Sequence, residues 1–220
     1  METKEIVEKI GAYWDDYAPK FDEAHDTEDL EAWARALRDC LGSPGPATVL
    51  DLGTGTGFLA NLAAAQGHFC LGVDISDKML AIAVEKTRAL GLKAVYLKGP
   101  DLPFPEGTFD YIVNSRLLWT LVEPLKTIGR WLGFLRPGGK IVCFNRFKEG
   151  LGMCGGKDVY GNENLDRAVT LAHAPSSADL IKLFTEAGLT EVEFRHLPKL
   201  TLPERDDGYD EWYALMGTKP

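Results

Sequence analysis

The sequence has few of the residues from which metal centres and disulfide frameworks are built. Its 220 residues contain four cysteines and four histidines, and no two cysteines form a C-x-x-C pair. No histidine stands near a cysteine at the spacing of zinc ligands. We therefore expect no metal site, and we expect reduced, mostly buried thiols at the four cysteine positions, Cys40, Cys70, Cys143 and Cys154.

Long apolar runs and a surplus of basic residues are also missing. No stretch approaches about 18 uncharged apolar residues, and the first five residues are charged or polar after Met1. This pattern predicts a cytoplasmic protein without a signal peptide or a membrane span. The 24 Lys and Arg residues stand against 33 Asp and Glu, a net charge of −9, which argues against a surface that tracks nucleic-acid phosphates. A small molecule is the expected partner, and the oligomeric state is left open.

Glycine, in contrast, is concentrated after one apolar segment. The stretch Val49-Leu50-Asp51-Leu52 is followed by Gly53-Thr54-Gly55-Thr56-Gly57 and then by an Ala- and Leu-rich segment. This order predicts a buried strand, a tight turn and a helix start. Glycine permits positive φ angles and lets a ligand lie against bare backbone, while the N-terminus of the helix favours an anionic group. The layout is typical of a nucleotide pocket.

The spacing of these glycines indicates which nucleotide is bound. A dinucleotide fingerprint needs G-x-G-x-x-G, and Phe58 stands where its third glycine should be. A second acid, Asp74, follows 23 residues after Asp51 (74 − 51), about one strand–helix–strand unit. Both acids are therefore expected at the carboxyl ends of neighbouring strands, where open α/β sheets bind ligands. A glycine-rich turn alone would also suit an ordinary strand-to-helix connection.

The D-x-G-x-G-x-G pattern with Asp74 resembles the class I S-adenosylmethionine-dependent methyltransferases. The resemblance implies that the glycine turn passes under the methionyl part of S-adenosylmethionine and that Asp74 holds the ribose hydroxyls. Residues 99–105, G-P-D-L-P-F-P, are similar to the third motif of the family, but proline replaces the acid that contacts adenine and the loop is two residues shorter. The cofactor-binding residues implied are Tyr13, Asp51, Gly53, Thr54, Gly55, Gly57, Asp74, Ile75, Met79, Pro100, Asp101, Leu102, Asn114, Ser115 and Arg116.

Two further segments match the family in the expected order. Residues 115–122, S-R-L-L-W-T-L-V, resemble a variant found in small-molecule methyltransferases, and residues 135–142, L-R-P-G-G-K-I-V, resemble its helix-to-strand junction. In the family the strand before the first of these segments ends facing the transferable methyl group. Asn114, Ser115 and Arg116 are therefore candidates for the site; the alternative is a capped strand end with Arg116 in a surface ion pair.

Residues 1–45 form a predicted helical arm or lid before a domain at 46–220. Apolar residues at spacings of three and four predict two amphipathic helices, separated near residues 19–27. The segment Tyr13 to Asp22 resembles the family's entry segment, which folds over the cofactor. Its aromatic rings could equally dock the helix onto the sheet.

Residues 146–176 break the alternation of strands and helices and contain five glycines. A loop of this length inside a domain is usually functional, so we assign it to the acceptor side of the pocket. Tyr160 and His173 are the candidate general bases there. A histidine of this kind is more often simply hydrogen-bonded or exposed.

Together these features predict an α/β three-layer sandwich, with a Rossmann-like, mostly parallel seven-stranded sheet and helices on both faces. The resemblance adds the antiparallel last strand. The predicted function is methyl transfer from S-adenosylmethionine to a nitrogen, oxygen or sulfur of a small molecule, with S-adenosylhomocysteine as product. A non-catalytic S-adenosylmethionine-binding module and a nicotinamide-dependent oxidoreductase are the alternatives.

Overall fold

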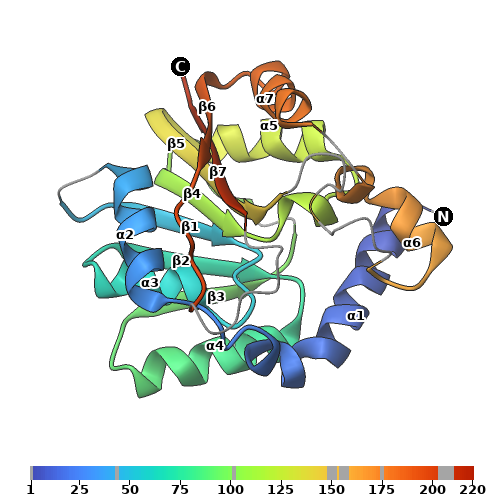
Figure 1. Ribbon diagram of the computed structural model, residues 1–220, viewed down its shortest axis with the longest axis horizontal. Coiled ribbons are helices and arrows are strands. Elements are labelled where there is room, and N and C mark those ends of the chain that lie inside the picture. The colour runs from blue at the N-terminus through green and yellow to red at the C-terminus, as the bar shows by residue number, and fades with distance from the viewer. Residues whose placement is uncertain are drawn as a thin grey trace.

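Seven strands form one sheet in the computed structural model, in the order β3-β2-β1-β4-β5-β7-β6 (Figure 1). The structure describes residues 2–42, 45–100, 103–147, 153, 159–173, 176–202 and 211–220. The first five strands run parallel, and β7 is antiparallel to both of its neighbours. The strands are β1 (Thr48–Leu52), β2 (Phe69–Asp74), β3 (Ala94–Lys98), β4 (Phe109–Ser115), β5 (Leu135–Arg146), β6 (Thr190–His196) and β7 (Trp212–Thr218). The predicted mostly parallel seven-stranded sheet is confirmed.

Helices cover both faces of this sheet because alternate residues of its central strands are apolar on both sides. Val49, Val113 and Val142 face α2 (Leu30–Leu41) and α3 (Phe58–Ala65). Leu50 and Ile112 face α5 (Pro124–Phe134) and α7 (Ser177–Glu186). Helix α4 (Asp77–Ala89) packs against β2 and β3. The result is the predicted three-layer arrangement.

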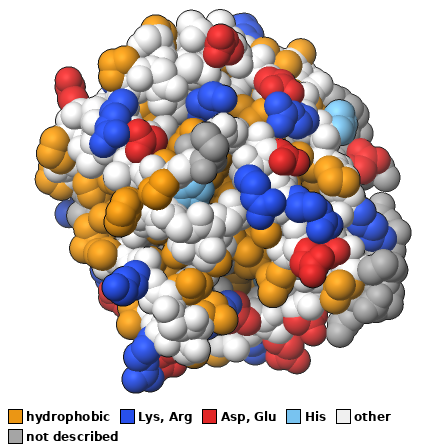
Figure 2. Space-filling model, turned by 90° about the vertical axis from the view of Figure 1, so that its left-hand side faces the viewer, with side chains coloured by type: hydrophobic (Ala, Val, Ile, Leu, Met, Phe, Trp, Pro, Cys, Tyr) orange, Lys and Arg blue, Asp and Glu red, His pale blue; other side chains and the backbone are white. Residues whose placement is uncertain are grey.

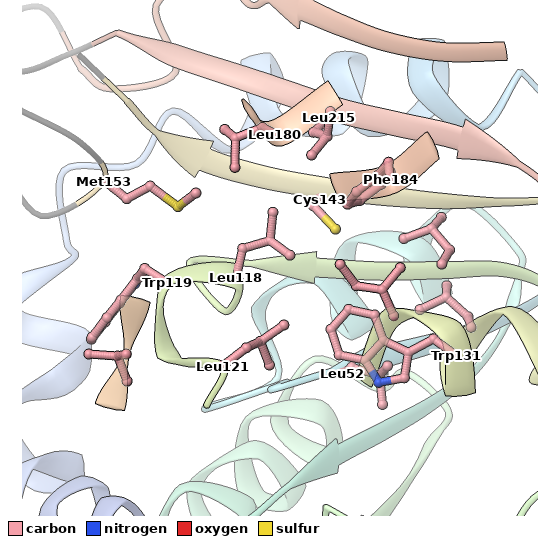
Figure 3. Close-up of a cluster of buried hydrophobic side chains, with 14 of the residues drawn as sticks. Leu52, Leu118, Trp119, Leu121, Trp131, Cys143, Met153, Leu180, Phe184 and Leu215 are labelled. Atoms are coloured by element: carbon pink, nitrogen blue, oxygen red, sulfur yellow. The ribbon is translucent and has the colours of Figure 1, made fainter. Parts of the chain in front are cut away.

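The core on the α5 and α7 face reaches the end of the sheet at which the parallel strands finish. Trp131 of α5 and Phe184 of α7 pack within this core, together with Cys143 of β5 (Figure 3). Leu118 and Trp119, in a 3₁₀ turn at Leu118–Thr120, extend the cluster toward Met153. This apolar layer fixes the position of the chain just after β4, where the site is expected.

Helix α1 (Thr3–Ala24) corrects the predicted break near residues 19–27. The helix continues through Pro19 and ends at Ala24, with His25 as its C-cap residue. Proline removes one backbone hydrogen bond, but Ala18 is buried and Phe21 continues the packed aromatic face, so packing holds the helix together. The break between α1 and α2 therefore lies only at residues 25–29.

The segment 146–176 contains more regular structure than a loop. It includes the short helix α6 (Glu163–Ala168) and a 3₁₀ turn at Thr170–His173. Helix α6 lies beside α1 (Figure 1), and the ring of Tyr160 packs edge-on against Tyr13 with centroids 5.0 Å apart. Tyr160 and α6, in the described part of this segment, therefore pack against α1.

The surface and the cysteines agree with the composition. Cys40, Cys70 and Cys143 are free and buried as expected, whereas Cys154 lies outside the described residues. In the described part of the chain, no helix is long and apolar enough to cross a membrane, and no cluster of possible metal ligands is present. On the face shown in Figure 2, basic and acidic side chains are interspersed.

Candidate functional site

A cavity of about 1750 Å³ opens where β1, β2 and β4 end, and α1 lies across it. Its lining comes from the glycine turn, the end of β2, the segment after β4, the end of β5 and the aromatic face of α1. A pocket for a single drug-sized ligand usually measures about 300–1,000 Å³. The cavity therefore has room for a nucleoside cofactor and a second small molecule.

The glycine turn is held in place by Asp51. Its Oδ2 accepts hydrogen bonds from Thr54 Oγ1 at 2.6 Å and from the backbone N–H of Ala60 at 3.0 Å. The side chain is 1% exposed, and burial raises its pKa to about 7. Asp51 and Thr54 do not line the cavity among the described residues, so their contribution is to shape the turn from beneath.

The three glycines of the turn face different surroundings. A Cβ on Gly53 would lie 2.6 Å from Leu117, and one on Gly57 would lie 2.6 Å from the hydroxyl of Tyr96. A Cβ on Gly55 would point to the cavity, with Phe21 as its nearest neighbour at 3.9 Å. Gly57 is thus a packing position, Gly53 lines the cavity but is packed against Leu117, and Gly55 is the bare backbone that a ligand can approach.

Asp74 ties the turn to the next loop. Its Oδ2 accepts from the N–H of Gly55 at 2.8 Å, and its Oδ1 accepts from the N–H of Ser76 at 2.9 Å. Burial raises the pKa of Asp74, while these two backbone N–H groups act in the opposite direction. Each oxygen keeps a lone pair for a further donor. Ile75 and Met79, two of the predicted cofactor-binding residues, line the cavity beside it.

Helix α1 is fastened to both loops by acidic side chains. Asp15 accepts from Ser76 Oγ at 2.6 Å and from the N–H of Lys78 at 3.1 Å, at the N-terminus of α4. Asp22, two turns later, accepts from Thr56 Oγ1 at 2.7 Å and from Lys86 Nζ at 2.9 Å. Tyr13, Trp14, Tyr17 and Phe21 line the cavity between these contacts. The aromatic residues therefore serve both packing and the site.

Arg116 follows β4. It forms an ion pair, but a largely buried one, in contrast to the surface ion pair that was the alternative from the sequence. Its side chain is 22% exposed and pairs with Glu28, whose side chain is 7% exposed. The guanidinium lies over Trp212, 4.6 Å from the ring centroid. Arg116 has φ +59, an uncommon conformation for a residue other than glycine. A buried charge pair and a strained backbone thus occur together at the cavity wall.

The other predicted residues are distributed unevenly. Ser115 and Pro100 line the cavity, whereas Asn114 is fully buried and donates from Nδ2 to Cys143 Sγ at 3.0 Å. Asp101 and Leu102 lie outside the described residues. The described part of the third motif that lines the cavity is therefore Gly99 and Pro100.

Neither candidate base from the 146–176 segment is placed as expected of a base. His173 is exposed, and its Nε2 donates to the carbonyl of Asp166 at 3.1 Å. Tyr160 is 9% exposed and packs between Tyr13 and Trp119. Neither Tyr160 nor His173 is among the described residues that line the cavity, whereas Val159, next to Tyr160, is. Their predicted role as proton acceptors has no geometric support here.

Three residues at the cavity were missed by sequence reasoning. His25 and Glu28 follow α1, and Asn145 lies at the carboxyl end of β5. Asn145 is 1% exposed, and neither Nδ2 nor Oδ1 has a hydrogen-bond partner in the described part of the chain. Its position at the end of the fifth strand was a usable signal, because polar residues at that edge face the ligand. No motif marks His25 or Glu28.

Comparison with protein families identifies a methyltransferase domain. Residues 50–143 match the family described as "Methyltransferase domain", from β1 to the middle of β5. A demethylmenaquinone methyltransferase of Thermus thermophilus is 36% identical over 114 residues, 50% of this chain and 52% of that protein. The ubiquinone/menaquinone biosynthesis C-methyltransferase of Citrobacter koseri is 37% identical over 118 residues, 50% and 47% of the two chains. The chain thus spans about half the length of these curated relatives.

Solved structures share the fold over more of the chain. The [4+2]-cyclase SpnF has a TM-score of 0.75 at 18% identity and covers 97% of both chains. An S-adenosylmethionine-dependent methyltransferase of Aquifex aeolicus has a TM-score of 0.66 at 21% identity, over 93% of this chain and 98% of that one. At such identities the likeness concerns the fold alone.

Proposed function

We infer that this chain, a member of the class I S-adenosylmethionine-dependent methyltransferase family, binds S-adenosylmethionine at the glycine turn and Asp74 and methylates a small organic molecule. The proposal rests chiefly on one observation. The carboxylate of Asp74 and the bare backbone of Gly55 meet on the wall of a cavity at the carboxyl ends of β1 and β2.

The residues of this wall suit the proposed cofactor. Asp74 offers lone pairs to the two ribose hydroxyls, and Gly55 leaves space that a side chain would fill. Ile75 and Met79 supply apolar surface for a purine ring, and the rings of α1 supply electron-rich faces that attract a cation such as a sulfonium. When bound, S-adenosylmethionine supplies an electrophilic methyl group.

The protein's own contribution is positioning and exclusion of water. Helix α1 is held over the turn by Asp15 and Asp22, and its aromatic residues line the cavity on that side. Holding two reactants at near-attack distance contributes about 7–11 kcal/mol when the geometry is right. The chemistry therefore requires no nucleophilic side chain from the chain itself.

The acceptor we propose is a small molecule with an aromatic ring. Trp14, Trp119 and Trp212 line the cavity beyond the glycine turn, and ring faces of this kind stack on planar ligands. The names of two relatives refer to demethylmenaquinone and to ubiquinone/menaquinone biosynthesis, which supports the same class. An 18S rRNA (guanine-N(7))-methyltransferase of Schizosaccharomyces pombe also matches, but over only 32% of its length, and the net charge of −9 disfavours RNA.

A second candidate is a module that binds S-adenosylmethionine without transferring its methyl group. It is favoured by Pro100, which stands where relatives carry the acid that contacts adenine. The nicotinamide-dependent alternative is disfavoured by the match to a methyltransferase domain.

Calorimetry with S-adenosylhomocysteine and NAD tests the cofactor. We expect saturable binding of S-adenosylhomocysteine alone, weakened roughly 30-fold in Asp74→Ala because a charge-assisted hydrogen bond contributes about 2 kcal/mol. Asp77→Ala, which removes a neighbouring exposed carboxylate, is the matched control and should leave the affinity unchanged. Equal affinities in folded Asp74→Ala and wild type would remove Asp74 from the cofactor site.

Turnover separates the two candidate functions. Protein, S-adenosylmethionine and one acceptor at a time are incubated, and S-adenosylhomocysteine is quantified by mass spectrometry. The acceptors are 1,4-dihydroxynaphthalene, 2-naphthol, an arylamine and an arylthiol. Product that depends on both acceptor and Asp74 supports a methyltransferase. Tight binding of S-adenosylhomocysteine without product from any acceptor supports the binding module.

A further inference from the structure

His25 lies between the glycine turn and two of the arginines that line the cavity, Arg116 and Arg146. Its imidazole stacks on Phe21, with ring centroids 4.2 Å apart and planes at 25°. Phe21 in turn is the nearest neighbour of the Cβ position of Gly55, at 3.9 Å. One aromatic ring therefore separates His25 from the bare backbone proposed to carry the methionyl group, and His25 itself lines the cavity.

The hydrogen bond of His25 determines which nitrogen carries its proton. Nδ1 lies 2.7 Å from the carbonyl oxygen of Phe21. A carbonyl can only accept, so Nδ1 bears the hydrogen and the neutral ring keeps its lone pair on Nε2. No hydrogen bond engages Nε2 within the described part of the chain. The ring is thus held in the tautomer that can accept a proton.

Burial and the neighbouring positive charges favour the neutral form of His25. Arg116, at the end of β4, and Arg146, at the end of β5, face it together with Asp22 of α1, while Glu28 is engaged by Arg116. Burial and the two arginine charges lower the pKa of His25 below its usual value, against the opposing effects of the Phe21 carbonyl and Asp22. A half-buried neutral imidazole beside cationic groups is suited to receive a proton from an acceptor whose anion the arginines favour.

We propose that His25 is the general base of this site and that the acceptor is a phenol or enol whose hydroxyl donates to Nε2. The hydroxyl proton passes to Nε2, and the electron pair left on oxygen, or on the conjugated ortho carbon, forms the new bond to the methyl carbon. The methyl–sulfur bond breaks with its electron pair going to sulfur. The imidazolium then releases its proton to water, and after attack by carbon the ring loses a second proton to restore aromaticity. This inference rests on the proposed methyl transfer and deepens it.

A purely structural role for His25 is the competing explanation, because His25 is also the C-cap residue of α1. His25→Asn distinguishes the two roles, since the asparagine Nδ2–H can take over the bond of Nδ1 to the Phe21 carbonyl while no group replaces Nε2. His196→Asn, on the exposed face of β6, is the matched control. A helix-capping role predicts lower stability in His25→Gln and normal behaviour in His25→Asn.

Nuclear magnetic resonance tests the proposal without turnover. Protein labelled with ¹⁵N-histidine is saturated with S-adenosylhomocysteine and titrated with 2-naphthol, and the His25 signals are assigned with His25→Asn. We expect a non-protonated Nε2 at pH 7 whose resonance moves upfield with saturable 2-naphthol binding. An Nε2 resonance that stays unchanged while 2-naphthol binds would overturn the role of His25, and failure of 2-naphthol to bind would overturn the phenol class.

Kinetics supply the second readout. His25→Asn should lower kcat on 2-naphthol by roughly 100-fold or more and abolish the acidic limb of the pH profile, whereas His196→Asn should match wild type. On pentafluorophenol, which is already ionised at neutral pH, the deficit should shrink to less than about threefold. An equal deficit on both phenols would assign His25 a structural role.

Failure of the proposed function would look different. Absence of S-adenosylhomocysteine binding to wild type would contradict the proposed function itself. Methylation of the arylamine alone would be consistent with methyl transfer but would contradict the role of His25 as a general base for a phenol.

Discussion

Gly55 and Gly91 both have a left-handed backbone, but only Gly55 faces the cavity, so the same substitution should affect binding at Gly55 alone. Gly55 has φ +53 and faces the cavity, while Gly91, at the end of α4, has φ +66 and no neighbour within 4 Å. Alanine at either position strains a left-handed backbone by about 1–2 kcal/mol. We expect both variants to lose similar stability in urea unfolding. Only Gly55→Ala should also lose S-adenosylhomocysteine binding in calorimetry, and equal binding by the two would remove Gly55 from the pocket wall.

The side-chain amide of Asn145 has no hydrogen-bond partner in the described part of the chain. Because Asn145 also lines the cavity, we expect a bound ligand to supply that partner. A buried polar group without a partner destabilises a fold by about 1–3 kcal/mol, and Asn145 has two such atoms in the described structure. Asn145→Leu should therefore raise the free energy of unfolding by about 1 kcal/mol, with Tm higher by about 2–4 °C. It should also raise KM for the acceptor and leave the affinity for S-adenosylhomocysteine unchanged.

Asn61 provides the contrast for this prediction. It is also buried, but its Oδ1 accepts from Thr87 Oγ1 at 2.7 Å. Asn61→Leu should lower Tm because Thr87 loses that acceptor. If leucine destabilised both positions alike, the amide of Asn145 would be satisfied in solution and its assignment to the acceptor would fail.

At this residue scale, motifs predicted which positions matter but not what each one does. The pattern placed Asp51, Gly55 and Asp74 at one edge of the sheet, where they are found. It could not separate Asp51, which binds Thr54 beneath the turn, from Asp74, which faces the cavity, because both stand at the carboxyl end of a strand. His25 was missed because its role depends on side chains from α1, β4 and β5 that are distant in sequence.

At the scale of elements, α1 is held over the site by two carboxylates spaced seven residues apart. Replacing Asp15 and Asp22 by Asn removes charge-assisted hydrogen bonds to Ser76 and Thr56. We expect amide hydrogen exchange in residues 3–24 to become roughly tenfold faster, a change of about 1.4 kcal/mol in local opening, and release of S-adenosylhomocysteine to accelerate.

The helix offers its own control for this prediction. Asp16 is exposed and makes only a 3.8 Å contact with Lys78, and Glu23 is also exposed. Asp16→Asn with Glu23→Gln changes the net charge by the same amount without touching the loops. Equal exchange rates in the two double variants would show that charge, rather than the contacts of Asp15 and Asp22, governs α1.

Elements were predicted well where local signals agree with packing. Ser76 caps α4 by accepting a hydrogen bond from the N–H of Met79, and Gly67 adopts φ +88 after α3. Local signals were wrong at Pro19, where burial of a continuous aromatic face outweighs one lost hydrogen bond. Residues 135–142 were expected to contain the junction between a helix and the fifth strand, but β5 already begins at Leu135, and its register with β4 shifts between Leu135 and Lys140.

At the scale of the whole molecule, unfolding should depend on pH through the buried carboxylates. Burial raises the pKa of Asp51 to about 7, so folding takes up a proton below that pH. The stabilisation that protonated Asp51 contributes is fully present below the pKa of this side chain in the unfolded chain, about 4. It is lost as the pH rises through 7, the pKa in the folded protein. At about 1.4 kcal/mol per unit, Asp51 alone should lower the free energy of unfolding by about 2.5 kcal/mol between pH 5 and pH 8. Asp74 acts in the same direction and His25, with its lowered pKa, in the opposite one.

Asp51→Asn isolates this contribution, because asparagine stays neutral and its Oδ1 can still accept from Ala60 N–H. We expect the variant to have a flatter pH profile than wild type in urea unfolding at pH 5, 6, 7 and 8, so that its stability relative to wild type improves as the pH rises. Asp16→Asn, at an exposed position, should follow the wild-type profile. Parallel profiles for Asp51→Asn and wild type would mean that the carboxylate ionises at its usual pH in the folded protein. In that case the N–H of Ala60 and the hydroxyl of Thr54 would outweigh its burial, and the glycine turn would rest on a permanent charge.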